Sequence, residues 1–514
     1  MLTLVSAMDR AARLYGARPA IIDRERTFTW AEFLDRVARA ATVLGDHGLG
    51  PGDRFAILSR NTFRNAEMVH AGYWMGAVPV PVNIRLATPE IRFVLDDSDA
   101  KLLVVEDAMA DLAMTDELAT WRGRVIHQTA DGDDPADAAW PQYEALLAAA
   151  APAAPREAAE DDDAILFYTG GTTGRSKGVQ LTHRNVIANG MQVAPAMRIK
   201  FDDVYLHVAP MFHSADLLGT GYTLMGATHA FLPQFSGAEL LRALRDYRVT
   251  QVMLAPTMII MALQEDDFET YDLSHFRLLF YGSSPMAVEW IRRAMDRFPG
   301  EIQQGYGLTE TSPILTTLDM EEHAAALATG EFDILRSVGR PVIGVDLRIV
   351  SDDGNEVPVG EGGEVVIRAP NVTRGYLNRA EENAAAFRGG WFHTGDVGRV
   401  DEAGYLYLLD RKKDMVITGG ENVYTSEVEA ALYQHPGVHE AAVVGVPDTK
   451  YGEALFAAIV KTPGANPTED DIIAHCRQRI GGYKVPRRVA FVDAMPKSAM
   501  GKILKNELRR IYSD

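Results

Sequence analysis

Short apolar runs alternate with longer segments of helical periodicity along the first 320 residues of the chain. Apolar runs predict strands at residues 20–22, 28–30, 54–58, 101–105 and 165–168, and a run interrupted by prolines predicts an edge strand at 77–81. Residues 31–44 follow the helical period, and Thr29 with Glu32 three residues later fits a capping box at the start of this helix. Strands that alternate with helices are typical of α/β layers built on parallel sheets.

The pattern changes further along the chain. Residues 129–163 are dominated by alanine, proline and aspartate, which favours a surface connection, and residues 335–400 are β-rich. After Asp410 the pattern predicts a small separate domain, with helices at 426–434 and 469–480 and strands at 440–446, 454–461 and 488–492. We therefore expect an α/β protein with a large N-terminal domain of α/β-layered subdomains plus a β-rich subdomain (residues 1–410), and a small C-terminal α+β domain (residues 411–514).

Composition excludes several classes of protein. The net charge of −20 over 514 residues argues against nonspecific nucleic-acid binding. From Arg411 onward, 15 basic and 13 acidic residues give a net of +2, which suits the handling of polyphosphates, although ordinary charge scatter explains it as well. Cys476 is the only cysteine, so no disulfide can form within the chain and a reducing compartment is favoured. The amphipathic N-terminus does not fit a signal peptide, and no window of about 20 apolar residues predicts a membrane span.

A loop rich in glycine and threonine follows the strand expected at 165–168. It reads Thr169-Gly170-Gly171-Thr172-Thr173-Gly174-Arg175-Ser176-Lys177-Gly178. Glycines let backbone N–H groups approach an anion, the threonines add hydroxyl donors, and the two basic residues add charge. The loop is not the common P-loop, because Lys177 precedes a glycine and no helical run follows. It indicates a phosphate cradle, with a solvated hairpin turn as the alternative.

Two other segments place small or acidic residues at the ends of expected strands. In Tyr306-Gly307-Leu308-Thr309-Glu310 the carboxylate can hold Mg²⁺ through oxygen, and the alternative is a helix start capped by Thr309. In Phe280-Tyr281-Gly282-Ser283-Ser284-Pro285 the small residues make room for a flat ring, and the alternative is an ordinary strand-to-helix turn.

The last third of the chain carries three more candidate segments. Asp396 follows Thr394-Gly395, and by itself fits an Asx-turn. The segment Thr418-Gly419-Gly420-Glu421 is a second glycine-rich loop, or a β-turn. In Pro496-Lys497-Ser498-Ala499-Met500-Gly501-Lys502 a lysine on a glycine-flanked loop can approach a carboxylate and an α-phosphate together.

In their order and spacing these motifs resemble those of the AMP-forming adenylating enzymes: acyl-CoA synthetases, adenylation domains of peptide synthetases and beetle luciferases. The resemblance runs from about residue 10 to residue 510 and rests on the Thr-Gly-Gly-Thr-Thr-Gly-x-x-Lys-Gly, Tyr-Gly-x-Thr-Glu and Pro-Lys-Ser-x-x-Gly-Lys segments. Two positions depart from the family pattern. Gly171 stands where serine is common, and Ser176 replaces the usual proline, but neither change removes a required charge.

The resemblance implies a role for each motif. Thr309 would contact the α-phosphate, Glu310 would bind Mg²⁺, and Lys502 would stabilise the transition state of adenylation. The ATP or AMP site would comprise Thr169, Gly170, Gly171, Thr172, Thr173, Gly174, Lys177, Gly282, Ser283, Ser284, Gly305, Tyr306, Gly307, Thr309, Asp396 and Arg411, the last two binding the ribose. The C-terminal domain would be mobile about a hinge at Lys413, and Gly419, Gly420 and Glu421 would line the CoA tunnel.

The reaction implied is acid + ATP + CoA giving acyl-CoA, AMP and pyrophosphate through an acyl-adenylate, with ATP, Mg²⁺ and CoA as cofactors. The expected acid pocket comprises His213, Ser214, Leu218, Tyr281, Gly282, Gln304 and Gly305, with His213 facing the substrate. No Arg or Lys occurs in it, which counts against a dicarboxylate. Its small residues favour a long or flat acid, and of these we expect a medium- or long-chain fatty acid.

Alternatives to a fatty acyl-CoA ligase stay open. They are an aryl or cinnamic/ferulic-type acid, an enzyme that loads a carrier protein, and a luciferase-like use of oxygen. A non-catalytic binding protein is disfavoured because Lys502, Glu310 and Asp396 are all intact. We also expect a cytoplasmic protein that can form a homodimer.

Overall fold

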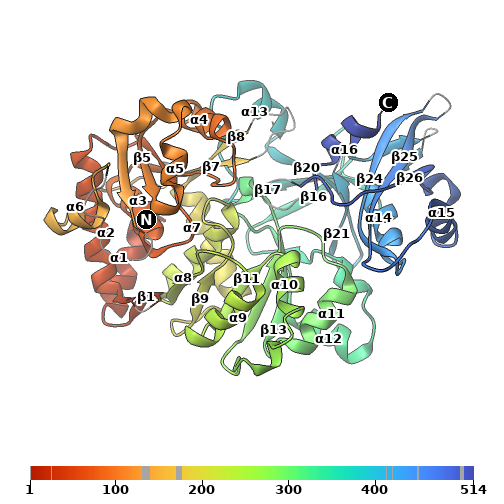
Figure 1. Ribbon diagram of the computed structural model, residues 1–514, viewed down its shortest axis with the longest axis horizontal. Helices are drawn as coiled ribbons and strands as arrows, with labels where there is room; N and C mark the ends of the chain where they lie inside the picture. Colours follow the sequence, from red (N-terminus) through yellow and green to blue (C-terminus); the bar gives the residue numbers. More distant parts are fainter. Residues whose placement is uncertain are drawn as a thin grey trace. The chain divides into compact units, whose positions relative to one another are not determined.

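The computed structural model describes residues 2–24, 26–129, 139–169, 176–411, 414–418, 421–448, 451–497 and 503–513 (Figure 1). The chain forms two compact units, Met1–Asp346 with Arg368–Phe392, and Leu347–Ile367 with His393–Asp514. The boundary expected between residues 410 and 411 falls inside the second unit, at the end of strand β21 (Leu406–Arg411), and stays a prediction.

The first unit is built on a nine-stranded sheet of order β15-β14-β13-β12-β11-β9-β10-β1-β2. Its central strands from β1 to β13 are parallel, whereas β2, β14 and β15 pair antiparallel at the two edges. The strands are β1 Pro19–Asp23, β2 Arg26–Thr29, β9 Val204–His207, β10 Thr228–Phe231, β11 Gln251–Leu254, β12 Leu278–Gly282, β13 Glu301–Tyr306, β14 Thr316–Leu318 and β15 Arg340–Pro341. Every residue of β10, β11 and β12 is buried, as expected for parallel strands covered on both faces.

Two smaller sheets complete this unit. A parallel sheet of order β4-β3-β5-β6 contains β3 (Arg54–Leu58), β4 (Val78–Pro81), β5 (Ala100–Glu106) and β6 (Val125–Gln128). An antiparallel sheet of order β18-β8-β7 contains β7 (Asp163–Thr169), β8 (Lys177–Thr182) and β18 (Gly375–Tyr376). The proline-containing β4 lies at a sheet edge, as its sequence predicted, because proline cannot donate to a ladder on both sides.

Helices separate these strands along the chain. Figure 1 shows α9, α10, α11 and α12 grouped around β11 and β13. The helices of the unit are α1 Leu4–Tyr15, α2 Trp30–Asp46, α3 Phe63–Met75, α4 Thr88–Asp97, α5 Ala110–Ala113, α6 Tyr143–Ala149, α7 His183–Ala196, α8 Gly219–Met225, α9 Gly237–Asp246, α10 Pro256–Leu263, α11 Val288–Arg297, α12 Met320–Thr329 and α13 Ala380–Ala386. The capping box predicted for α2 is present, since the Thr29 hydroxyl accepts from the Glu32 N–H and the Glu32 carboxylate accepts from the Thr29 N–H.

The prediction that residues 129–163 form only a surface connection is wrong. This stretch contains α6, whose Tyr143 is fully buried and donates to Glu67 on α3 at 2.9 Å. The alanines that suggested a linker also have the highest helix propensity, and one buried aromatic ring is enough to fix the helix on the core.

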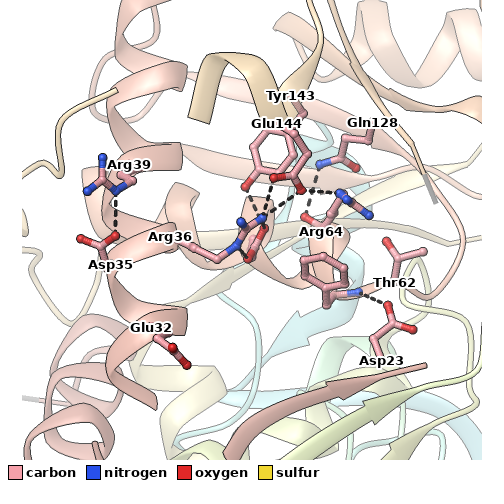
Figure 2. Close-up of polar contacts among 12 residues, drawn as sticks. Asp23, Glu32, Asp35, Arg36, Arg39, Thr62, Arg64, Gln128, Tyr143 and Glu144 are labelled. Atoms are coloured by element: carbon pink, nitrogen blue, oxygen red, sulfur yellow. Dashed lines mark hydrogen bonds and ion pairs between the residues drawn. The ribbon is translucent and has the colours of Figure 1, made fainter. Parts of the chain in front are cut away.

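A buried ionic cluster joins α2, α3 and α6 (Figure 2). Arg36 pairs with Glu67 and, at 2.9 Å, with Glu144, while Glu144 also accepts from Arg64 at 2.6 Å. Glu67 is fully buried, and burial raises its pKa against the opposing effect of Arg36. Each carboxylate pairs with a guanidinium, so the cluster fixes helices α2, α3 and α6 against one another.

The second unit contains the predicted small C-terminal fold and part of the β-rich region. Strands β16 (Asp346–Val350), β17 (Gly363–Arg368), β20 (Trp391–Val400) and β21 form one sheet. The other sheet has the order β23-β22-β25-β24, with β26 paired to β25. Its strands are β22 Val416–Thr418, β23 Glu421–Val423, β24 Val438–Asp448, β25 Gly452–Lys461 and β26 Arg488–Phe491, and the helices are α14 Thr425–Tyr433, α15 Glu469–Arg477 and α16 Lys505–Tyr512.

Among the residues that the structure describes, no helix combines the length and the apolar character needed to cross a bilayer.

Candidate active site

The expected phosphate loop connects two antiparallel strands. Thr169 ends β7 and pairs with Lys177 at the start of β8, so the connection is a hairpin and no helix follows it. Residues 170–175, which include Gly170, Gly171, Thr172, Thr173 and Gly174, lie outside the described residues. Lys177 has only 15% of its side chain exposed, and its Nζ lies 3.9 Å from Glu382 and 5.3 Å from the centre of the Tyr376 ring. The ring of Tyr376 therefore supports the side chain of the loop lysine, Lys177.

Thr309 and Glu310 lie on a single 3-10 turn, η5 (Thr309–Thr311), directly after β13. The expected alternative, a helix capped by Thr309, is absent, since Leu308 occupies the position before the turn. The Thr309 hydroxyl lies 2.9 Å from the Ser214 hydroxyl, which connects the predicted α-phosphate contact to the predicted acid pocket.

Tyr376 joins the acidic turn to the loop lysine. Its hydroxyl donates to Oε1 of Glu310 at 2.9 Å, while its ring faces Lys177. The Glu310 carbonyl also accepts from the Thr373 N–H at 2.7 Å. Sequence reasoning missed Tyr376, because one tyrosine in a two-residue strand carries no motif.

Glycines lie where the strands beside this turn pack closely. Gly282 and Gly305 are register partners on β12 and β13, and a Cβ on Gly282 would lie 2.5 Å from the Gly305 carbonyl oxygen. A Cβ on Gly305 would run into the Phe280 ring, and one on Gly307 into the Pro313 carbonyl. Ser283, with φ of 70°, and Ser284 follow as exposed residues at the strand end. The glycines are thus required by close packing against the protein's own backbone and the buried Phe280 ring, and the predicted binding of a flat ring here stays a prediction.

The predicted acid-pocket residues occupy two neighbouring regions. His213 and Ser214 open the 3-10 turn η3 (Ser214–Leu218), where His213 Nδ1 accepts from the Ala215 N–H at 3.2 Å. Leu218 ends this turn and is buried. On the sheet, Tyr281 is buried with its hydroxyl 3.0 Å from His323, and burial raises its pKa. Gln304 is buried beside it, and its Oε1 has no hydrogen-bond partner among the described residues.

The two predicted ribose ligands lie in the second unit, on neighbouring strands. Asp396 on β20 is the register partner of Arg411 on β21. Asp396 is buried, and its N–H donates to the Thr394 hydroxyl at 3.1 Å. This adjacency of two residues 15 positions apart fits a shared role, which stays a prediction.

Several predicted residues cannot be placed. Lys413, Gly419, Gly420 and Lys502 lie outside the described residues, and Glu421 is described only as the backbone start of β23. Lys497 and Ile503 pair as an isolated bridge, so the ends of the segment that carries Lys502 lie side by side.

The described residues fit a magnesium ion held mainly by substrate. No group of three or more His, Cys, Asp or Glu side chains gathers in the part of the chain that the structure describes. Mg²⁺ commonly binds one or two carboxylates together with substrate phosphates and water. Glu310 alone would therefore be sufficient as the ligand that the protein contributes.

Comparison with known proteins connects this geometry to a family. The family model described as AMP-binding enzyme matches residues 8–377, and the one described as AMP-binding enzyme C-terminal domain matches residues 427–502. Feruloyl-CoA synthase of Amycolatopsis sp is 38% identical over 505 residues, 98% of each chain. The long-chain-fatty-acid–CoA ligase FadD13 of Mycobacterium tuberculosis is 36% identical over 486 residues, 94% of this chain and 93% of that one.

A solved structure agrees with the fold. The o-succinylbenzoate CoA synthetase (MenE) from Bacillus subtilis, in complex with its acyl-adenylate intermediate OSB-AMP, matches with a TM-score of 0.85 and 30% identity over 98% of this chain and 97% of that chain. The predicted fold class is confirmed, and ATP, CoA and Mg²⁺ are the cofactors expected of the family. The chain belongs to the AMP-binding enzyme family and is an AMP-forming acyl-CoA synthetase.

Proposed function

We propose that this protein joins a carboxylic acid to CoA in two steps at the site around Thr309. The observation that carries the proposal is the arrangement in the first unit. Thr309 and Glu310 are fixed by Ser214 and Tyr376, and Tyr376 also contacts the lysine that ends the glycine-rich loop. Hydroxyl, carboxylate and ammonium groups thus converge where a polyphosphate would need them.

In the first step a carboxylate oxygen of the acid attacks the α-phosphorus of ATP, and pyrophosphate leaves. No general base is required, because the acid is already the nucleophile. Thr309 donates to the α-phosphate, Lys502 stabilises the charge that develops on it, and Asp396 with Arg411 holds the ribose. Mg²⁺, when bound through Glu310, neutralises charge on the phosphates.

In the second step the CoA sulfur attacks the carbonyl carbon of the adenylate, the thiol proton is lost, and AMP leaves. We place the hinge at Lys413, next to the domain boundary predicted after Asp410. The Gly419-Gly420-Glu421 loop then serves CoA after Lys502 has withdrawn. Separating the steps protects the adenylate from water. We further propose a cytoplasmic enzyme that can form a homodimer.

Two classes of acid are candidates. The small, apolar pocket residues favour a medium- or long-chain fatty acid, and the similarity to FadD13, named for long-chain fatty acids, supports this. An aryl acid of the ferulic type is the second candidate, favoured by the 38% identity to feruloyl-CoA synthase over nearly the whole chain.

The test is pyrophosphate release with MgATP across both acid classes, each with and without CoA. CoA-dependent turnover supports the ligase, release that is independent of CoA indicates a carrier-protein acceptor, and no release with any acid contradicts the proposal. Lys502→Ala should abolish adenylation but still allow thiolation of supplied acyl-adenylate. Lys461→Ala removes a half-buried lysine, bonded to Asn466 at 2.7 Å and 4.2 Å from the centre of the Phe491 ring, and is the matched control.

A further inference from the structure

Four buried amide side chains lie next to the acidic turn in the first unit. Asn185, Asn189 and Gln192 share one face of α7, because they are spaced four and three residues apart, and Asn371 lies in the segment that leads to β18. Each of the four is at most 6% exposed. A buried amide is costly unless its donors and acceptors are paired, so the partners of these side chains show which part of the chain they fix.

Three of the amides form a hydrogen-bonded chain that ends at the acidic turn. The Asn189 amide donates to Oε1 of Gln192 at 3.0 Å, and the Gln192 amide donates to Oδ1 of Asn371 at 3.3 Å. The Asn371 amide in turn donates to the Thr311 carbonyl at 2.6 Å and to the Ile314 carbonyl at 3.0 Å. Amides in series polarise one another, so each bond in the chain strengthens the next. The last residue of η5 is thereby tied to α7 through Asn371.

The segment that carries Asn371 contacts the same turn at two further atoms. The Thr373 N–H donates to the Glu310 carbonyl at 2.7 Å, and the Tyr376 hydroxyl donates to the Glu310 carboxylate at 2.9 Å. The Ser312 hydroxyl donates back to the Asn371 carbonyl at 3.0 Å. Residues 371–376 therefore hold both the side chain of Glu310 and the backbone on either side of it.

The turn needs this support because its backbone leaves regular secondary structure. Thr309–Thr311 is a single 3-10 turn, and Ser312 after it has φ of 62°, a left-handed conformation that is costly for a residue with a side chain. Such a conformation persists only where its surroundings fix it. Asn189 contributes here too, since it accepts from the Ile314 N–H at 3.3 Å and donates to the Ile314 carbonyl at 2.8 Å.

We propose that Asn371 is a positioning residue that holds Thr309 and Glu310 where MgATP binds. This rests on the proposed function, in which Thr309 contacts the α-phosphate and Glu310 binds Mg²⁺. Asn371 acts through the Thr311 carbonyl and leaves the contacts with substrate to the turn itself. Groups that orient a metal ligand in this way typically change metal affinity by about 10–100-fold when they are removed.

The test measures binding as well as turnover. Asn371→Leu keeps the branched shape of the side chain and removes every donor and acceptor of the amide. Calorimetric titration with the Mg²⁺ complex of a non-hydrolysable ATP analogue should show about tenfold weaker binding, and pyrophosphate release should need about tenfold more Mg²⁺ for its half-maximal rate. Asn189→Leu, which releases only Ile314 from the turn, should weaken binding about threefold, the factor typical of one hydrogen bond.

Asn65→Leu is the matched control. Asn65 is a buried asparagine on α3 whose amide donates to the Arg60 carbonyl at 3.1 Å. Its loss should lower the melting temperature and leave binding of the analogue complex unchanged. A purely structural role of Asn371 predicts the same behaviour for Asn371→Leu, so a destabilised Asn371→Leu enzyme with parental binding overturns the inference.

A double-mutant cycle tests whether Asn371 acts through Glu310. Combining Asn371→Leu with Tyr376→Phe should raise half-saturating Mg²⁺ by less than the product of the two separate factors, because either change alone displaces the same carboxylate. Factors that multiply in full contradict this route and overturn the inference. If Asn371→Leu does not fold, Asn189→Leu decides, and parental binding in that variant overturns the inference as well. A parental enzyme that does not bind the analogue complex refutes the proposed function instead.

Discussion

Tyr376 contacts both Glu310 and Lys177, so substitutions of this residue should separate the effect of its hydrogen bond from that of its ring. Replacing Tyr376 by Phe removes the hydroxyl that donates to Glu310 at 2.9 Å but keeps the ring that lies 5.3 Å from the Lys177 Nζ. Replacing it by Leu removes both. The change to Phe should weaken the binding of Mg²⁺ through Glu310. Only the change to Leu should also weaken the binding of the ATP phosphates near Lys177.

The magnitudes follow from the surroundings. A hydrogen bond to an ionised carboxylate contributes about 1.5–3 kcal/mol when buried. Glu310 and Tyr376 are half-buried, so water replaces part of the loss and about 1 kcal/mol is expected, which is roughly a fivefold change. A cation–π contact at a partly exposed site adds about 0.5–1 kcal/mol, or roughly two- to fivefold.

The assay is pyrophosphate release titrated with Mg²⁺ at saturating ATP, then with ATP at saturating Mg²⁺. Tyr376→Phe should raise half-saturating Mg²⁺ about fivefold with little change in kcat. Tyr376→Leu should in addition raise the KM for ATP. Tyr271→Phe, which removes a hydroxyl–carboxylate contact of 3.2 Å to Asp267 on the exposed surface, is the matched control. An unchanged Mg²⁺ titration in Tyr376→Phe would refute the positioning of Glu310, and equal effects of Phe and Leu would refute the ring contact.

Three further changes test the structure at other points. Gly305→Ala should lower the free energy of unfolding in urea by about 1–3 kcal/mol, because its methyl group would meet the buried Phe280 ring, whereas Gly123→Ala, in open space on the surface, should leave it unchanged. Glu144→Gln should lower the free energy of unfolding in urea by about 2 kcal/mol, since Arg36 and Arg64 both lose their shared carboxylate; the exposed Asp35→Asn should cost less than about 0.5 kcal/mol, and equal losses would contradict the role of the cluster. Burial raises the pKa of Cys476 to about 11, so iodoacetamide should not label the folded protein at pH 8 but should label it in urea, and rapid native labelling would contradict its burial.

Local pattern was sufficient to predict most of the secondary structure. Strand β3 matches its predicted range of 54–58, and the helix expected at 31–44 extends only one residue earlier and two later as α2. These segments have strong periodicity together with a cap or a turn residue at their ends. Residues 143–149 were misjudged because composition was used where two buried side chains, Tyr143 and Leu147, hold a short helix on the core.

The site was predicted unevenly for a physical reason. Glycine and charged residues at fixed spacing point to phosphate chemistry even in a linear sequence, so the segments around Thr169, Gly305 and Glu310 could be recognised. Tyr376 acts only through a strand pairing with β8, almost 200 residues earlier, and nothing in its neighbours along the chain indicates that contact.

The acid pocket shows why wall residues alone give an incomplete view of specificity. The sequence pointed to an apolar pocket because the expected wall contains no lysine or arginine, and that inference considered only cations. The structure adds an uncharged acceptor to that wall, because Gln304 is buried and its Oε1 has no hydrogen-bond partner among the described residues. A buried acceptor without a donor costs free energy, so hydrogen-bonding groups decide the fit of an acid as much as charges do. A wall judged only by its lack of cations therefore leaves out the groups that can distinguish one uncharged tail from another.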